Sequence, residues 1–219
     1  LAFNYFMNGE IISTAKDHPF LGVTLSDNLK YNKHIDIITK KALQTLGFIK
    51  RNLKSCPRAV KERAYQTLVR PKVEYASPIW NPHQQTQVKQ IEQIQRKAAR
   101  FVDNKPFNRN QPDSVSAIIS SLHWPTLQQR RHYFDLGLLY RVVHHHIAIP
   151  ATYVPTQATI HSTRYSNNLK FLQPHCRLNL YQHSFFPRVI PAWNMLPSSV
   201  VCVPNLDDFK IAVQPIPMS

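Results

Sequence analysis

Residues 35–53 read IDIITKKALQTLGFIKRNL, and this stretch sets the fold class of the chain. Its apolar residues recur every three or four positions, which places them on one face of an α-helix. These residues are Ile35, Ile38, Ala42, Leu46, Ile49 and Leu53. Lys33, Lys40, Gln44 and Arg51 fall on the opposite face. The pattern predicts an amphipathic helix with an apolar face in a core and a basic face in solvent.

Similar spacing predicts helices along most of the remaining chain. A second helix should begin near Pro57 and run to about Arg70, where Pro71 should end or kink it, because proline disrupts a helix interior. Further helices are expected at 84–102, at 114–122, from Trp124-Pro125-Thr126 onward, at 184–193 and at 206–213. Residues 147–175 hold three prolines and lack periodicity, so we expect loop or extended chain there.

The first thirty residues indicate a small β unit. Asn8-Gly9 is a hairpin-turn dipeptide between two short apolar runs, and residues 20–25 (FLGVTL) form a β-prone run closed by Ser26-Asp27-Asn28. The expected fold is therefore mainly α, with a small N-terminal β-hairpin, a helical bundle and a loop-rich helical C-terminal region. The parts expected are residues 1–30, 31–110 and 111–219.

The basic charge of the chain points to a polyanionic partner. Lys and Arg number 27 against 12 Asp and Glu, which gives a formal net charge of +15. Residues 30–72 hold twelve of these cations and only two acids, Asp36 and Glu62. Focused charge of one sign favours a nucleic-acid surface over an ordinary solvated face, which remains the alternative. The candidate phosphate contacts are Lys33, Lys40, Arg51, Lys54, Arg58, Lys61, Arg63, Lys89, Arg96 and Arg100.

No residue pattern indicates a catalytic or metal site. The twelve carboxylates are scattered, and the adjacent pair Asp207-Asp208 suits the first turn of a last helix, where the helix dipole favours negative charge. The clusters His144-His145-His146 and His175-Cys176 with His183 lack the spacing of zinc ligands. We therefore expect no catalytic residue and no cofactor in this chain. A stand-alone metal-dependent nuclease using Asp207-Asp208 is the weaker alternative.

The three cysteines form no close pair, so a reducing compartment is expected, either nucleus or cytoplasm. No apolar run approaches the roughly 20 residues that span a bilayer, and no membrane partner is expected. The sequence begins at Leu1 and not at Met, so we expect a fragment or a processed piece of a longer protein.

An ordered series of short motifs resembles the C-terminal part of the reverse transcriptase of non-LTR (LINE-type, jockey-like) retrotransposons. Each motif is weak alone, but together they cover nearly the whole chain in the order of the family. The motifs are FLGVTLS at 20–26, LGFIKRNL at 46–53, YQTLVRP at 65–71, EYAS at 74–77, WNPH at 80–83, QRKAARFV at 95–102, WPTLQQRR at 124–131, STR at 162–164, FFPR at 185–188 and WNMLP at 193–197.

The resemblance implies roles for the parts of the chain. Leu21, Gly22 and Val23 would form a hairpin similar to the primer grip, and residues 31–110 a thumb that holds the template–primer duplex of RNA and DNA. The catalytic aspartates of the family, with their Mg²⁺, would lie in a palm upstream of Leu1, so this chain alone would be inactive. Its partners would be RNA, DNA and the missing palm and fingers. A decayed or domesticated fragment acting as an interaction module is the alternative.

Overall fold

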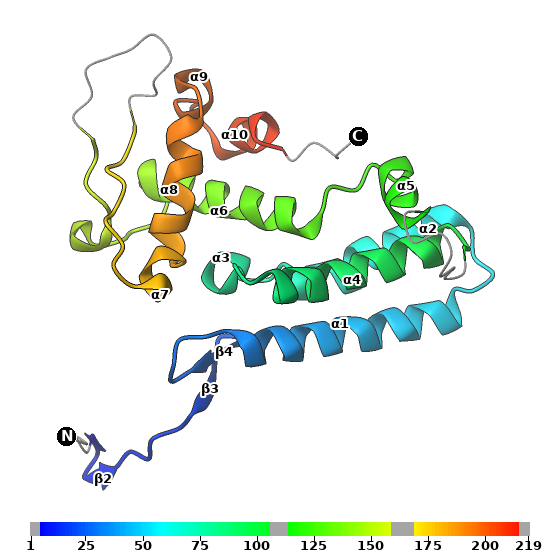
Figure 1. The fold of residues 1–219 in the computed structure, drawn as a ribbon, viewed down its shortest axis with the longest axis horizontal. Coiled ribbons are helices and arrows are strands. Elements are labelled where there is room, and N and C mark those ends of the chain that lie inside the picture. Colours follow the sequence, from blue (N-terminus) through cyan, green and yellow to red (C-terminus); the bar gives the residue numbers. More distant parts are fainter. Residues whose placement is uncertain (1–4, 106–113, 159–168, 215–219) are drawn as a thin grey trace.

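The computed structural model describes residues 5–105, 114–158 and 169–214. The protein is mainly helical, and two small antiparallel hairpins precede the helices (Figure 1), so the predicted fold class is confirmed. The hairpins pair β1 (Phe6–Met7) with β2 (Glu10–Ile11) and β3 (Asp17–Phe20) with β4 (Val23–Ser26). The larger helices are α1 (Asn32–Asn52), α2 (Arg58–Ala64), α4 (Gln85–Val102), α5 (Ser114–Ser121), α6 (Leu127–Val143), α8 (Phe185–Met195) and α10 (Leu206–Ala212). Short helical turns are η1 (Tyr65–Val69), η2 (Arg70–Val73), α3 (Ser77–Trp80), η3 (Ala151–Tyr153), α7 (Asn179–Gln182) and α9 (Ser198–Val201).

Both hairpins turn through two residues of positive φ, the geometry that matches the twist of paired strands. The predicted turn at Asn8-Gly9 is confirmed, with φ of 52° and 84°. The expectation of one β-prone run over residues 20–25 is wrong, because Leu21 (φ 46°) and Gly22 (φ 83°) turn the chain back within it. Leucine rarely adopts this conformation, so composition did not indicate the turn.

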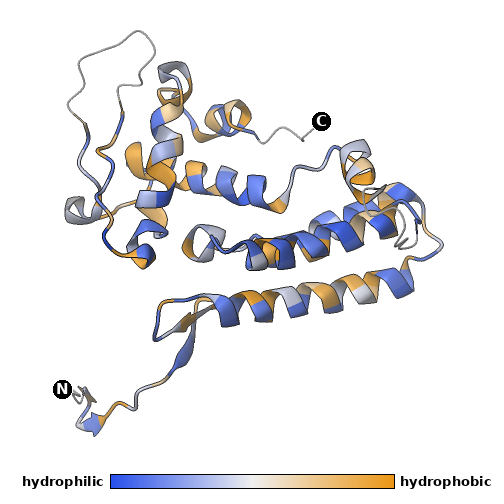
Figure 2. Cartoon of the chain, viewed as in Figure 1, coloured by the Kyte–Doolittle hydropathy of each residue, from blue (hydrophilic) through white to orange (hydrophobic). Residues whose placement is uncertain are grey.

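The first core forms around α1, whose predicted apolar face is confirmed. Ile35, Ile38, Ala42, Leu46 and Ile49 are all buried. They join apolar side chains of η1, α4 and α5, with Trp124 and Leu127. Figure 2 shows apolar and polar residues alternating along α1 and α4, as expected for helices buried on one side. This core thus includes residues 118–127, which the sequence assigns to the C-terminal part.

The second predicted helix is not regular. After α2 the chain widens into the π-helical turn η1, in which the Arg70 N–H donates to the Tyr65 carbonyl five residues back, and then tightens into the 3₁₀ turn η2. Tyr65, Val69 and Val73 are fully buried. The prediction that Pro71 ends or kinks the helix near Arg70 is confirmed, because the π-helical turn ends at Val69 and Pro71 lies in the first turn of η2, where no N–H is required.

Helix α6 connects the first core to a second one. Thr126 and Gln129 form a capping box at its start, as the Trp-Pro-Thr start signal predicts. Leu136, Leu139 and Tyr140 of α6 pack with side chains of α8, α9 and α10 around Trp193 and Phe209. In Figure 1, α1 lies along one edge of the molecule, with α4 between it and α6.

Buried polar groups join the two cores. Asp135 of α6 accepts hydrogen bonds from Arg188 of α8 (3.2 Å) and from Asn81, which follows α3 (2.9 Å). Arg188 also donates to the Pro78 carbonyl (2.9 Å). Nearby, the imidazoles of His83 and His183 stack at 3.7 Å between ring centroids. These hydrogen bonds and the imidazole stack therefore link α3, α6 and α8 where the two cores meet.

The β3–β4 hairpin docks on α1 and on the turn between η2 and α3 through three polar contacts. The Thr24 N–H donates to His34 Nδ1 (3.1 Å), Lys33 pairs with Asp17 (2.6 Å), and the Tyr75 hydroxyl donates to the Leu21 carbonyl (3.0 Å). Because His34 Nδ1 accepts, this imidazole is neutral. Its ring is buried against Trp80, with centroids 5.4 Å apart.

Acid should therefore weaken the protein through His34. Burial, with the charge of Lys41, holds the pKa of His34 below its ordinary value of about 6.5. Below about pH 6.5, His34 is protonated in the unfolded chain more readily than in the folded one, so the free energy of unfolding decreases as the pH falls. We expect His34→Asn, whose Oδ1 can accept from Thr24, to lose less unfolding free energy than wild type between pH 7.5 and 5.5 in urea titrations. Equal losses would contradict the role of His34, since the other histidines, His83 included, are present in both proteins.

Candidate nucleic-acid interface

Helices α1 and α4 lie side by side and run in the same direction (Figure 1). Side chains of α4 hold the seam between them: Gln87 donates to Asn32 (2.6 Å), and Gln90 donates to both Asp36 (2.8 Å) and Thr39 (3.1 Å). The helices therefore present their outer residues as one surface. We call this surface the α1–α4 face.

A shallow groove of about 670 Å³ follows the seam on the α1 side. It is lined by Lys40 and Arg51, two of the predicted phosphate contacts, and both are exposed. Gly47 lies between them in the groove, and the guanidinium of Arg51 lies over it, 3.7 Å from where a Cβ would be. The predicted α4 residues Lys89, Arg96 and Arg100 lie on the outer side of that helix, away from its buried residues.

Like charges meet near the C-terminal ends of both helices. Burial, together with the positive charges of Lys97 and Arg100, lowers the pKa of Lys50. Burial and Arg96 likewise lower the pKa of Arg100. The sequence prediction missed Lys50 and Lys97. Lys50 is half-buried on the flank of α1, whereas Lys97 is exposed on the outer side of α4, and the pairing of the two helices brings them together. The fold holds these cations close at an electrostatic cost, which a bound anion would relieve.

Little negative charge opposes these cations. α1 and α4 carry nine Lys and Arg residues but two carboxylates. Asp36 is engaged by Gln90 at the seam. Glu92 points toward α6, where it accepts the backbone N–H groups of Leu127 (3.3 Å) and Gln128 (2.7 Å). The α1–α4 face is therefore strongly positive along its length.

The predicted residues after α1 do not extend this surface as one set. Lys61 is 1% exposed; its ammonium donates to Asn104 Oδ1 (2.5 Å) and lies 5.3 Å from the Phe101 ring centroid. Its assignment to an exposed phosphate-binding surface is therefore wrong, since it packs inside the fold. Arg58 is exposed but lies 3.7 Å from Asp103. Lys54 and Arg63 are exposed.

The remaining predicted residues lie at the hairpin. Lys33 is on the outer side of α1, but it forms an ion pair with Asp17 (2.6 Å). The hydrogen bonds that Lys33 and Ser26 donate to Asp17 lower the pKa of this carboxyl group. Leu21 is exposed, and Val23 is buried in the first core. A Cβ at Gly22 would lie 3.2 Å from the Tyr75 ring, and the positive φ of Gly22 adds to the requirement for glycine. The residues compared with a primer grip do form a hairpin turn.

The acidic pair and the histidines take structural positions. Asp207 and Asp208 lie in the first turn of α10, where Asn205 caps the Asp208 N–H (2.8 Å), as the helix-start interpretation predicts. His144 stacks on Tyr140 and contacts the Val201 carbonyl (2.9 Å). Across the described residues, no three His, Cys, Asp or Glu side chains gather in a way that could hold a metal ion.

No family model, curated protein or solved structure was found to match the chain. The similarity to retrotransposon reverse transcriptases therefore stays a prediction from the sequence motifs. Among the described helices, none has both the length and the apolar character needed to cross a bilayer.

Proposed function

We propose that the chain holds a nucleic-acid duplex through the α1–α4 face, in the manner expected of the thumb of a reverse transcriptase. One observation carries the proposal: cations from two helices, Lys40, Lys50 and Arg51 with Lys89, Lys97 and Arg100, share a face with a single carboxylate, Asp36. Surfaces that are only solvated usually mix charges of both signs.

The chemistry of the face suits backbone contacts. Lys and Arg neutralise phosphates without reading bases, so binding should depend little on sequence. A straight pair of helices can follow the phosphates of an RNA–DNA hybrid, which proteins recognise by shape and backbone. We propose no chemical step for this chain; its role is to grip template and primer.

Removing three cations from the face should weaken binding strongly. We expect the triple variant Lys40→Gln, Arg51→Gln and Lys97→Gln to bind an RNA–DNA duplex about 10- to 100-fold less tightly near 0.1 M salt, because each lost phosphate contact removes about 0.9 from the slope of log affinity against log salt. The slope should therefore become shallower by about 2–3. Fluorescence anisotropy across a salt series measures both quantities.

The matched control removes the same charge elsewhere. Lys16, Lys72 and Arg177 are exposed and lie outside α1 and α4, so their replacement by glutamine should leave most of the binding intact. Equal weakening by both triple variants would show that net charge alone attracts the duplex. A wild-type affinity that is flat between low and moderate salt would also refute the proposal.

A further inference from the structure

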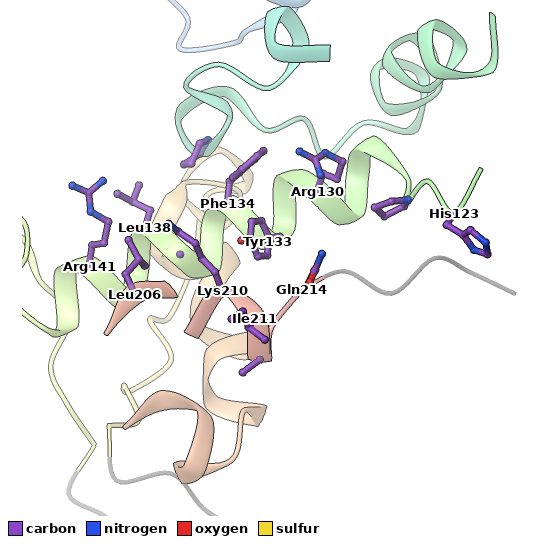
Figure 3. Close-up of a pocket in the computed structure, with 14 residues that line it drawn as sticks. His123, Arg130, Tyr133, Phe134, Leu138, Arg141, Leu206, Lys210, Ile211 and Gln214 are labelled. Atoms are coloured by element: carbon purple, nitrogen blue, oxygen red, sulfur yellow. The ribbon is translucent and has the colours of Figure 1, made fainter. Parts of the chain in front are cut away.

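A second groove, of about 1100 Å³, lies between α6 and α10 (Figure 3). One face of α6 forms its floor, because the lining residues recur at helical spacing. They are Arg130, Tyr133, Phe134, Gly137, Leu138 and Arg141. From α10, Leu206, Lys210 and Ile211 form the opposite wall, and Ile211 is 72% exposed. The groove is distinct from the α1–α4 face, since none of its lining residues belongs to α1 or α4.

Gly137 lines the floor of this groove and leaves it open because it has no side chain. It lies in the middle of α6, where glycine destabilises a helix relative to alanine by about 1 kcal/mol. A Cβ built on Gly137 would meet no atom of the described residues within 4 Å, so the core packing seen there does not require its small size. Larger residues at this position would project into the open groove.

The walls combine aromatic rings with positive charge. Tyr133 and Phe134 contact each other edge to face, with ring centroids 5.5 Å apart, and the guanidinium of Arg130 lies 5.6 Å from the Phe134 ring centroid. Arg141 is exposed at one end. Lys210 lies beside Tyr133 (Figure 3) and pairs with the 86% exposed carboxylate of Asp207 (2.9 Å), an interaction that solvent weakens. No carboxylate lines the described groove.

We propose that the groove between α6 and α10 binds an unpaired stretch of nucleic acid, with bases against Tyr133 and the apolar wall and phosphates near Arg141 and Lys210. The inference builds on the proposed function, because such a strand would extend from the duplex held at the α1–α4 face. Aromatic platforms flanked by cations bind single strands without sequence preference. The groove favours this ligand over a neutral apolar one, since Arg141 and Lys210 line it and no carboxylate of the described residues does. The third lining cation, Arg130, is already paired with Glu74 (3.0 Å).

Gly137 offers a test that leaves every charge in place. We compare Gly137→Leu, which fills the groove, with Gly137→Ala, which makes the same backbone change with little bulk. Both residues favour a helix over glycine, so neither should unfold α6. Anisotropy is measured with a blunt RNA–DNA duplex, with the same duplex carrying a single-stranded extension of about eight thymidines, and with the free thymidine strand.

We expect the extension to tighten wild-type binding about tenfold, Gly137→Ala to keep that gain, and Gly137→Leu to lose it. All three proteins should bind the blunt duplex alike. A gain that persists in Gly137→Leu, or no gain in wild type, would overturn the inference while leaving the α1–α4 proposal in place. Binding of the free strand but of no duplex would overturn the proposed function alone. If an acidic helical peptide binds and Gly137→Leu blocks it, while no strand binds, the groove is a peptide site and the inference is wrong.

Discussion

Asp135→Ala is expected to lower the free energy of unfolding by about 3–5 kcal/mol, because it removes one partner from a buried ion pair. Asp135 is 1% exposed and holds Arg188 and Asn81 across the junction of the two cores. It also offsets the charge of Arg131, which is fully buried and whose two Nη atoms have no hydrogen-bond partner among the described residues. The substitution would leave Arg188 without its carboxylate and remove one of the negative charges near Arg131, which would keep Glu92. Urea denaturation followed by circular dichroism measures the loss.

A double variant distinguishes the loss of the Asp135–Arg188 attraction from the cost of leaving Arg188 buried without a partner. Burial raises the pKa of Asp135 despite the attraction of Arg188, so ionised Asp135 has a desolvation cost in the fold. Asp135→Leu combined with Arg188→Met should therefore cost less than the two single changes added, with a coupling of about 1–3 kcal/mol. A cost below about 1 kcal/mol for Asp135→Ala alone would show that this network does not hold the junction.

Trp193→Ala should cost about 3–5 kcal/mol, because it leaves a cavity at the centre of the second core. The indole is fully buried beside Phe209, with ring centroids 5.8 Å apart, and its Nε1–H donates to the Leu169 carbonyl (2.8 Å). Trp193→Phe keeps most of the packing but removes the hydrogen bond to the Leu169 carbonyl, so its cost should be about 1–2 kcal/mol.

The remaining tryptophans make this measurement specific to each core. Trp80 and Trp124 both belong to the first core, so fluorescence of Trp193→Ala reports that core alone, while circular dichroism reports helices of both. We expect a lower unfolding midpoint by circular dichroism than in wild type. An unchanged midpoint would contradict the second core described around Trp193.

The sequence predicted most reliably the elements that local periodicity specifies. The buried face of α1 follows from its spacing alone, and so does the span of α4, observed at Gln85–Val102 against an expected 84–102. Where contacts distant in sequence decide, local pattern was insufficient. The turn at Leu21-Gly22 depends on Tyr75, which binds the Leu21 carbonyl from 54 residues away.

The candidate site was predicted in part for the same reason. Lys40 and Arg51 could be placed on an outer face because the helix period fixes them opposite the apolar residues of α1. Lys61 resembles them in sequence, but its burial depends on Asn104 and Phe101, which only the tertiary fold brings near. The proximity of Lys50 to Lys97 could not be found from one helix at a time, since it is a property of the α1–α4 pair.

The π-helical turn η1 has a consequence for how the chain can evolve. It accommodates one more residue per turn than its neighbours, and this widening sets which way Tyr65, Val69 and Val73 point. Deleting or inserting a single residue in this segment would rotate every later side chain by about 100° and carry Val73 out of the core. Substitutions on its exposed side, such as at Leu68, would leave that register intact. Homologous chains should therefore vary at the exposed positions of residues 65–73 while keeping the length of this segment.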